Sequence, residues 1–371
     1  MNLFVYGTLL SRDLMAAVAG PGPLDPAPAV LNGFSLRPMR DNVVPFITPA
    51  DGAATTGIVW RDLTADQQAR LDAYEGAFGY TLDQVQVLVN GDPVAALCYM
   101  PPKGIIAGDG SWSLATWEAV HLAPAIYAAS ELFAHRPLPE HGALRRMWPM
   151  IEARAWSKHR ATAGPSTVRY TAKPCDIRMV AQRPPQGSFF RLQSLDVKHR
   201  RFDGAQSHVL VREVFVGVDA AIVLPYDPQR DRVLLVEQAR MGPFGRHDPN
   251  PWTLEPVAGI VDARESPQMT ARRETQEEAN VTLRHIEPVS QFYASPGAST
   301  DYFYSFIGLC DLPATEAYLG GLASEGEDLR LHPMSFDAAL DLADTGEIAT
   351  GPLVLLLNWL ARHRDRLRAM A

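Results

Sequence analysis

Glu274, Glu277 and Glu278 crowd three carboxylates into a short stretch of the chain. If that stretch is a helix, with about 100° per residue, Glu274 and Glu278 project only about 40° apart and Glu277 lies near them. Like charges at this spacing destabilise a bare helix by about 0.2–0.5 kcal/mol per pair, so we expect a positive group to offset them. Carboxylate oxygens that converge from one face suit a hard cation such as Mg²⁺. Taken alone, Glu277 and Glu278 are more typical of an ordinary solvated helix face.

The residues around these glutamates predict a helix with defined ends. Ser266 is a good N-cap, Pro267 fits the first helical position, and Asn280 can adopt the left-handed conformation that closes a C-terminus. A face of small residues that could lie close against a sheet is formed by Ala271, Thr275 and Ala279. The sequence therefore predicts a short, sheet-packed helix that carries the three carboxylates.

The spacing of the whole stretch from 259 to 281 favours a metal site over a solvated face. Five, seven and two residues separate Gly259, Glu265, Arg273-Glu274 and Glu277-Glu278. This pattern resembles the box of the Nudix hydrolases at six fixed positions. Two residues depart from the family pattern, because Asn280 stands where Gly is usual and Thr275 where an aliphatic residue is usual. Neither departure touches an expected metal ligand.

The resemblance continues on both sides of the box and covers roughly residues 170 to 371. Three further segments are similar to the ADP-ribose pyrophosphatase branch of the family: Glu255-Pro256-Val257-Ala258-Gly259, Ala294-Ser295-Pro296-Gly297 and Glu325-Gly326-Glu327-Asp328-Leu329-Arg330. The resemblance implies metal-assisted attack of water on a phosphorus of ADP-ribose, which gives AMP and ribose 5-phosphate. A pyrophosphate diester carries two negative charges that repel hydroxide, so bound cations, Mg²⁺ or alternatively Mn²⁺, are expected to neutralise them.

The same resemblance assigns roles to individual residues. The implied metal ligands are Glu274, Glu278, Glu327 and the backbone carbonyl of Ala258, and the implied general base is Glu325. Residues expected to hold the box together are Gly259, Glu265, Arg273 and Glu277. The ADP-ribose pocket is expected to include Arg212, Arg240, Pro296 and an aromatic ring from Phe189 or Phe190. NADH and sugar nucleotides remain alternative substrates, and relatives of this branch imply a homodimer through the Nudix domain.

Two short motifs near the start of the chain suggest a second site. Val5-Tyr6-Gly7-Thr8-Leu9 ends a predicted strand in a glycine turn, and Leu71-Asp72-Ala73-Tyr74-Glu75-Gly76 ends a predicted helix in an acidic residue. Together they resemble the gamma-glutamylcyclotransferase-like family over residues 1 to about 105. The resemblance implies that backbone N–H groups of the Tyr6-Gly7-Thr8-Leu9 turn bind a glutamyl carboxylate and that Glu75 moves the proton of the attacking amine. The alternative is that this domain is a non-catalytic binding or assembly module.

The pattern along the chain predicts two domains of the α+β class. A gamma-glutamylcyclotransferase-like small β-barrel with helices is expected over 1–162, and a Nudix α/β/α sandwich with a mixed sheet over 168–371. Strands are predicted at 3–6, 57–60, 84–89, 94–99, 220–224 and 232–238. Helices are predicted at 65–74, 114–134, 142–160 and 352–368. The break at Ala163-Gly164-Pro165-Ser166 is the expected linker because it combines small, flexible and helix-breaking residues.

Composition and charge exclude several classes of protein. The 371 residues include 34 basic and 42 acidic side chains, and the formal net charge of −8 argues against binding nucleic acid through its phosphates. The longest apolar stretches, such as 353–357, fall far short of the roughly 20 residues that a membrane helix needs. The first residues lack the pattern of an export signal, so we expect a cytoplasmic protein without a membrane partner.

Overall fold

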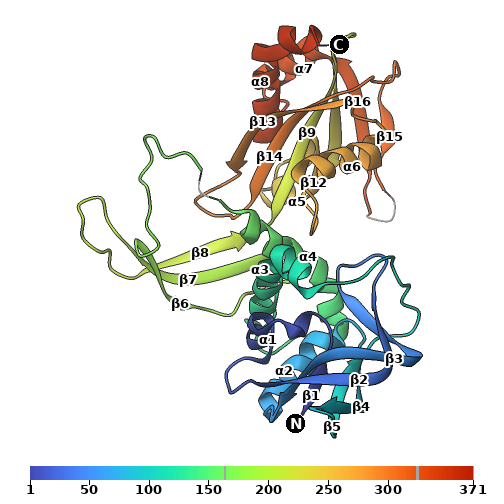
Figure 1. The fold of residues 1–371 in the computed structure, drawn as a ribbon. Helices are drawn as coiled ribbons and strands as arrows, with labels where there is room; N and C mark the ends of the chain where they lie inside the picture. Colours follow the sequence, from blue (N-terminus) through green and yellow to red (C-terminus); the bar gives the residue numbers. More distant parts are fainter. Residues whose placement is uncertain (163, 323–325, 371) are drawn as a thin grey trace. The chain divides into compact units, whose positions relative to one another are not determined.

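The computed structural model describes residues 1–162, 164–322 and 326–370, which form two compact units, Met1–Arg212 and Glu213–Ala371. Figure 1 shows the elements of each unit. The division falls after Arg212, so residues 168–212, which the sequence pattern assigns to the second domain, group with the first unit. Independent folding of the domains 1–162 and 168–371 therefore remains a prediction.

The first unit contains a closed five-stranded barrel, as the sequence predicts. Its strands follow the order β1-β3-β2-β4-β5, with β1 (Leu3–Val5) antiparallel to β3 (Pro45–Arg61) and parallel to β5 (Asp92–Met100). The remaining strands are β2 (Asp25–Pro38) and β4 (Thr81–Val89). Because side chains alternate along a strand, Phe4 and Tyr6 point into the barrel core, while Leu3 and Val5 face the helices.

Four helices accompany the barrel. They are α1 (Arg12–Ala19), α2 (Ala65–Gly76), α3 (Leu114–Leu132) and α4 (His141–Arg160), with a short 3-10 turn, η1 (Thr8–Leu10), directly after β1. Thr64 caps α2 through a reciprocal capping box with Gln67, which explains why this helix begins where it does. The predicted helices at 65–74, 114–134 and 142–160 are confirmed, whereas α1 and the long strand β2 were not predicted.

A three-stranded sheet completes the chain before the second unit. Its order is β6-β7-β8, with β6 (Ile177–Gln182) antiparallel to β7 (Arg191–His199), and β8 (Leu210–Val216) runs across the boundary at Arg212. All six residues of β6 are exposed. This sheet therefore buries little of its own surface.

The second unit is a mixed sheet between two layers of helices, which confirms the predicted α/β/α sandwich. The strands follow the order β13-β14-β9-β10-β16-β15, in which β9 (Asp219–Asp227) is parallel to β14 (Tyr302–Leu309) and antiparallel to β10 (Arg232–Ala239). The other strands are β11 (Trp252–Glu255), β12 (Val257–Ile260), β13 (His285–Tyr293), β15 (Tyr318–Gly320) and β16 (Leu329–Ser335). Strands β9 and β10 pair antiparallel, but their ladder is short because β11 pairs with β10 and β12 pairs with β9.

The alternation of side chains sends each strand's residues into two separate cores. Val223, Val236 and Val257 pack toward α6 (Pro267–Ala279), whereas Ile222 and Leu235 pack toward α7 (Phe336–Thr345) and α8 (Gly351–Arg368). Figure 1 shows α6 and the pair α7 and α8 on opposite faces of the sheet. One further short helix, α5 (Met241–Gly245), follows β10. Among the described residues, no helix is long and apolar enough to span a membrane.

Candidate active sites

Helix α6 forms with the ends that its sequence predicts. The Ser266 side chain accepts a hydrogen bond from the Met269 amide, Pro267 is the first helical residue, and Asn280 closes the helix in the left-handed region with φ of 52°. The predicted small face is buried, and Ala271 and Thr275 are fully inaccessible to solvent. The Thr275 hydroxyl donates to the Ala271 carbonyl at 2.7 Å, so this polar side chain is satisfied inside the helix.

Gly259 on β12 lets this helix approach the sheet. A Cβ atom added at Gly259 would overlap the carboxylate of Glu274. Gly259 is not in the left-handed region, so the close approach alone requires glycine here. The Glu274 side chain is only 12% exposed as a result of this packing. Gly259 is therefore placed where a structural role in the box is expected.

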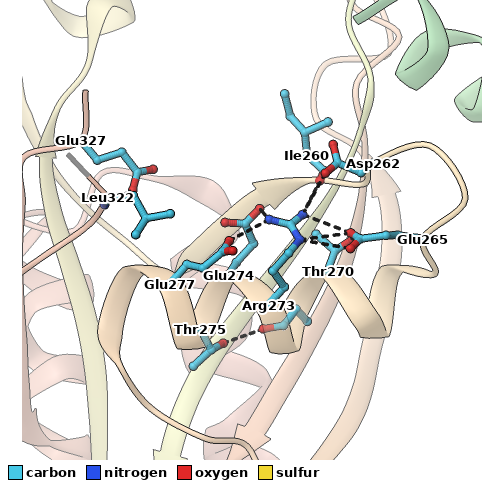
Figure 2. A network of polar contacts seen from close by, with 11 residues as sticks. Ile260, Asp262, Glu265, Thr270, Arg273, Glu274, Thr275, Glu277, Leu322 and Glu327 are labelled. Atoms are coloured by element: carbon cyan, nitrogen blue, oxygen red, sulfur yellow. Dashed lines mark hydrogen bonds and ion pairs between the residues drawn. The ribbon is translucent and has the colours of Figure 1, made fainter. Parts of the chain in front are cut away.

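Arg273 gathers the acidic residues of the box around one guanidinium, as Figure 2 shows. Its Nη1 donates to Glu274 at 2.7 Å and to Glu277 at 3.0 Å, and its Nη2 donates to Glu265 at 3.1 Å. Glu265 also accepts a hydrogen bond from the Thr270 hydroxyl at 2.7 Å. Burial alone would raise the pKa of Glu265, but the bonds from Arg273 and Thr270 outweigh it and hold the pKa below its usual value.

Glu278 is the most unusual carboxyl group of this cluster. It is 3% exposed, and its Oε2 has no hydrogen-bond partner among the described residues. Burial, and next the charges of Glu327 and Glu274, raise the pKa of Glu278 to about 9, against smaller opposing effects of Arg240 and of a hydrogen bond from the Ala258 backbone. Among the described residues, Glu278 is thus a buried carboxyl group that lies near two others and forms no ion pair with a basic side chain.

Glu327 reaches the cluster from the loop after β15. Its carboxylate accepts a hydrogen bond from the Leu322 amide at 3.0 Å, and the neighbouring Gly321 amide donates to the Glu278 carbonyl at 2.9 Å. A Cβ atom at Gly320 would overlap that same carbonyl, so the end of β15 lies directly against the end of α6. The predicted general base, Glu325, lies outside the described residues.

An ion pair that the sequence does not reveal lies beside these carboxylates. Arg240 donates from Nε and Nη2 to the two oxygens of Glu255, at 2.9 and 2.6 Å, and the Thr253 hydroxyl donates to the same carboxylate at 2.6 Å. Hydrogen bonding to Glu255, and next the charges of Glu278 and Glu327, raise the pKa of Arg240. Glu255 thus holds the Arg240 guanidinium near the carboxylates of Glu278 and Glu327.

The chemistry of this donor set fits a divalent cation. The unpartnered Glu278 oxygen and the like-charge crowding by Glu274 and Glu327 are what a bound cation would relieve. Within the described part of the chain, no three metal-ligating side chains converge closely enough to form a finished site. Glu274 is held by Arg273, and Glu327 is held by the Leu322 amide.

The remaining predicted pocket residues are spread over both units. Pro296 lies in an exposed turn of the second unit, in which the Ser295 carbonyl accepts hydrogen bonds from the amides of Ala298 and Ser299. Phe190 and Arg212 belong to the first unit. Phe190 is half exposed and packs edge-on against Phe189, with ring centroids 4.8 Å apart. A role of these three residues in one pocket stays a prediction.

The glycine turn of the first unit leads from a strand directly into a short 3-10 helix. After β1 the chain turns at Gly7 into η1, where the Leu10 amide donates to the Gly7 carbonyl and the Ser11 amide to the Thr8 carbonyl. Among the described residues, no hydrogen bond uses the amides of Gly7, Thr8 or Leu9. The side chains have structural roles, because the Tyr6 hydroxyl donates to the Tyr99 carbonyl at 3.0 Å and Leu9 is a buried core residue.

Glu75 ends α2 beside this turn. Burial raises the pKa of Glu75 to about 7. Burial also raises the pKa values of Tyr6, Tyr80 and Cys98, to which the nearby Glu75 charge adds a smaller effect. The Glu75 carboxyl group therefore lies near Tyr6 and Tyr80, close enough to the turn to interact with it electrostatically. A carboxyl group with a pKa near neutrality is suited to act as a proton carrier.

Comparison with known proteins finds a family match in each half of the chain. Residues 217–350 match the sequence model described as NUDIX domain, and residues 3–117 match the one described as gamma-glutamyl cyclotransferase, AIG2-like. The ADP-ribose pyrophosphatase of Escherichia coli (strain K12) is 36% identical over 204 residues, which make up 55% of this chain and 97% of the relative. The chain belongs to the Nudix family.

Two other Nudix relatives widen the comparison. The ADP-ribose pyrophosphatase of Haemophilus influenzae (strain ATCC 51907 / DSM 11121 / KW20 / Rd) is 34% identical over 52% of this chain and 89% of the relative. The GDP-mannose pyrophosphatase of Escherichia coli (strain UTI89 / UPEC) is 28% identical over 50% of this chain and 94% of the relative. The Nudix relatives therefore correspond to about half of the chain.

The Nudix alignment extends beyond the second unit. Its 204 aligned residues are more than Glu213–Ala371 contains, so part of the alignment falls before Glu213. Strands β6 and β7 and the first residues of β8 precede that boundary within the first unit. A segment that the Nudix relatives share is therefore structurally part of the first unit.

Proposed function

We propose that the Nudix half hydrolyses the pyrophosphate of ADP-ribose to AMP and ribose 5-phosphate with Mg²⁺. The observation that carries this proposal is the buried Glu278 oxygen, which has no hydrogen-bond partner among the described residues and lies near Glu274 and Glu327. The alignment with an ADP-ribose pyrophosphatase over 97% of that relative also supports it. When bound there, divalent cations would neutralise the diphosphate and activate the attacking water.

Each residue of the site then has a defined task. Glu274, Glu278, Glu327 and the Ala258 carbonyl would hold Mg²⁺, and Arg273 keeps Glu274 oriented through its 2.7 Å hydrogen bond. Arg240, which Glu255 fixes in place, would bind a phosphate oxygen and add positive charge as the leaving group forms. We assign the proton of the attacking water to Glu325 on the resemblance alone.

A panel of diphosphates tests the substrate. The protein should be assayed with Mg²⁺ against ADP-ribose, NADH and GDP-mannose, with the nucleoside monophosphate products quantified separately. We expect the highest kcat/KM for ADP-ribose and no turnover in excess chelator. A higher kcat/KM for NADH or GDP-mannose would assign another diphosphate to this site, and full activity in chelator would refute the metal assignment.

We propose a second activity for the first unit, the cyclisation of a gamma-glutamyl compound with release of 5-oxoproline. The amides of the Gly7-Thr8-Leu9 turn and the near-neutral pKa of Glu75 support it. Since the base must be deprotonated, turnover should rise with pH up to about pH 7 and then level off. If 5-oxoproline release is undetectable and Glu75→Gln changes nothing, the first unit is a binding or assembly module instead.

We also propose a homodimer through the Nudix domain. The apolar side chains Ile177, Met179 and Val180 on β6 are exposed, and a second copy of the chain would cover them in the dimer. Light scattering coupled to size-exclusion chromatography should give twice the 40.7 kDa mass of the chain. A mass of one chain across the micromolar range would contradict the dimer.

A further inference from the structure

Three charged side chains form a buried cluster in the first unit. Glu131 near the end of α3 accepts hydrogen bonds or ion pairs through its Oε1 from Arg154 Nε at 2.8 Å, Arg154 Nη2 at 2.7 Å and Arg191 Nη1 at 2.6 Å. The exposed fractions of the side chains of Glu131, Arg154 and Arg191 are 1%, 1% and 5%. Charges this deeply buried are tolerated only when they are paired.

The cluster joins the helices to the strand segment that follows them. Glu131 and Arg154 belong to the α3 and α4 hairpin, whereas Arg191 is the first residue of β7. A second bond runs the same way, because Arg154 Nη1 donates to the Phe189 carbonyl at 2.8 Å, two residues before β7. One buried arginine thus bonds both a helix carboxylate and the backbone beside the strand.

Strands β6 and β7 bury few apolar side chains that could attach them to the helices. Every residue of β6 is exposed, and in β7 only the polar residues Arg191 and Gln193 are buried. The Gln193 amide donates to the Arg183 carbonyl within the same hairpin at 2.6 Å, so it does not attach the hairpin to the helices. Arg191 is therefore the buried side chain through which this hairpin reaches the helices.

We propose that the α3 and α4 hairpin is a docking module that holds the β6 and β7 strands through the cluster Glu131-Arg154-Arg191. The hairpin lies almost entirely after the gamma-glutamyl cyclotransferase match, which ends at residue 117, and the strands lie before the NUDIX match, which begins at residue 217. The module would thus attach the segment next to the Nudix half to the first unit. Apart from the first four residues of α3, neither matched family model covers the hairpin or the two strands.

The other end of α4 is held independently. Arg145 Nε donates to the Ala77 carbonyl at 3.1 Å, and Trp148 packs edge-on against Tyr74 with ring centroids 5.9 Å apart. Loss of the cluster should therefore release the strands while α4 stays packed against α2. This separation makes the proposal testable within the full-length chain.

Hydrogen exchange of the full chain, followed by mass spectrometry, tests the module with Arg191→Met. This change leaves the Glu131–Arg154 pair balanced and removes only the strand's partner. We expect amides of β6 and β7 to exchange about a hundredfold faster, while α2, α3 and α4 keep their protection. The matched control is Asp196→Asn, which breaks the exposed Arg183–Asp196 pair of the same hairpin and should leave exchange unchanged.

Two outcomes would overturn the proposal. One is unchanged protection of β6 and β7 in Arg191→Met, which would mean that the cluster does not hold the strands. The other is a loss of protection spread evenly over the barrel and helices, because a docking contact should open locally. Arg191→Lys keeps a positive group opposite Glu131 and should restore most of the protection, which a purely steric role of the side chain would not explain.

Discussion

Gly259 on strand β12 lies so close to the carboxylate of Glu274 on helix α6 that an added Cβ atom would overlap it. A methyl group at position 259 has to displace either the helix or the carboxylate. Since a misplacement of about 1 Å at a reacting centre can cost about 10²-fold in rate, this contact ties the backbone of the sheet to the expected metal ligand.

Gly259→Ala should therefore lower kcat for ADP-ribose by about 10²-fold while the protein remains folded. Turnover and circular dichroism measure the two effects. Gly351→Ala is the matched control, because a Cβ at Gly351 meets no atom within 4 Å and should leave kcat unchanged. Normal turnover of Gly259→Ala would mean that the position of Glu274 is not critical.

Glu278→Gln should lower turnover by roughly 10³-fold or more without loss of the fold. The side chain keeps its size, and the change removes a carboxyl group whose ionisation is opposed by burial and next by the charges of Glu327 and Glu274. We therefore expect a midpoint of thermal unfolding in chelator that is equal to or above that of the wild type. Unchanged turnover, measured at saturating Mg²⁺, would discard Glu278 as a ligand.

Arg273→Met should destabilise the second unit by about 1–3 kcal/mol, because it leaves Glu265, Glu274 and Glu277 without their shared partner in a partly buried site. Urea unfolding measures the difference. Arg284→Met is the control, since its pair with Asp311 is 45% and 62% exposed and should contribute less than about 1 kcal/mol. Equal losses in the two variants would show that Arg273 does not hold the box together.

Glu75 should make the first unit less stable as the pH rises. Its pKa is raised from 4.5 to about 7 in the folded chain, so between these values the folded protein keeps a proton that the unfolded chain has released. Rising pH then favours unfolding until about pH 7, and the full penalty is about 1–3 kcal/mol for this partly buried group. Glu75→Gln should resist urea better than the wild type at pH 8 but equally at pH 4. Equal curves at both pH values would contradict the raised pKa.

Arg240→Met should raise KM for ADP-ribose more than it lowers kcat if the guanidinium binds a phosphate in the ground state. Glu255→Gln should have a smaller effect of the same kind, because Arg240 keeps its charge but loses its 2.6 Å partner. Steady-state kinetics of both variants give the comparison. A variant of Glu255 that is more damaging than Arg240→Met would point to a direct role for the carboxylate.

Local signals in the sequence were sufficient for the elements that carry the sites. Ser266, Pro267 and Asn280 define α6 through caps that depend only on neighbouring backbone groups, and all three occupy the predicted positions. The barrel was recognised although β2 was missed, since the many Pro and Gly residues of 25–38 disguise a strand whose pairing with β3 is long-range. Helix α1 was also missed, because it follows directly on the short turn η1.

Other features depended on contacts between distant parts of the chain. Glu255 gave no sign of its role, because its partner Arg240 lies fifteen residues away across the β10 and β11 hairpin. Segment 168–212 carries no pattern that separates it from the second domain, yet Arg191 is paired with Glu131 on an earlier helix. The burial of Cys98 and Cys310 and the exposure of Cys175 likewise depend on packing.

The amino-acid sequence by itself determined the Nudix box, its helix and the glycine turn near Glu75, because residue types at short fixed spacings specify caps, turns and helix faces. Only the tertiary structure decided that Glu278 is buried beside Glu327 and that Arg191 is paired with a helix far earlier in the chain. The raised pKa of Glu278 and the burial of Arg191 both depend on which distant segments exclude water, and that is a property of packing rather than of spacing.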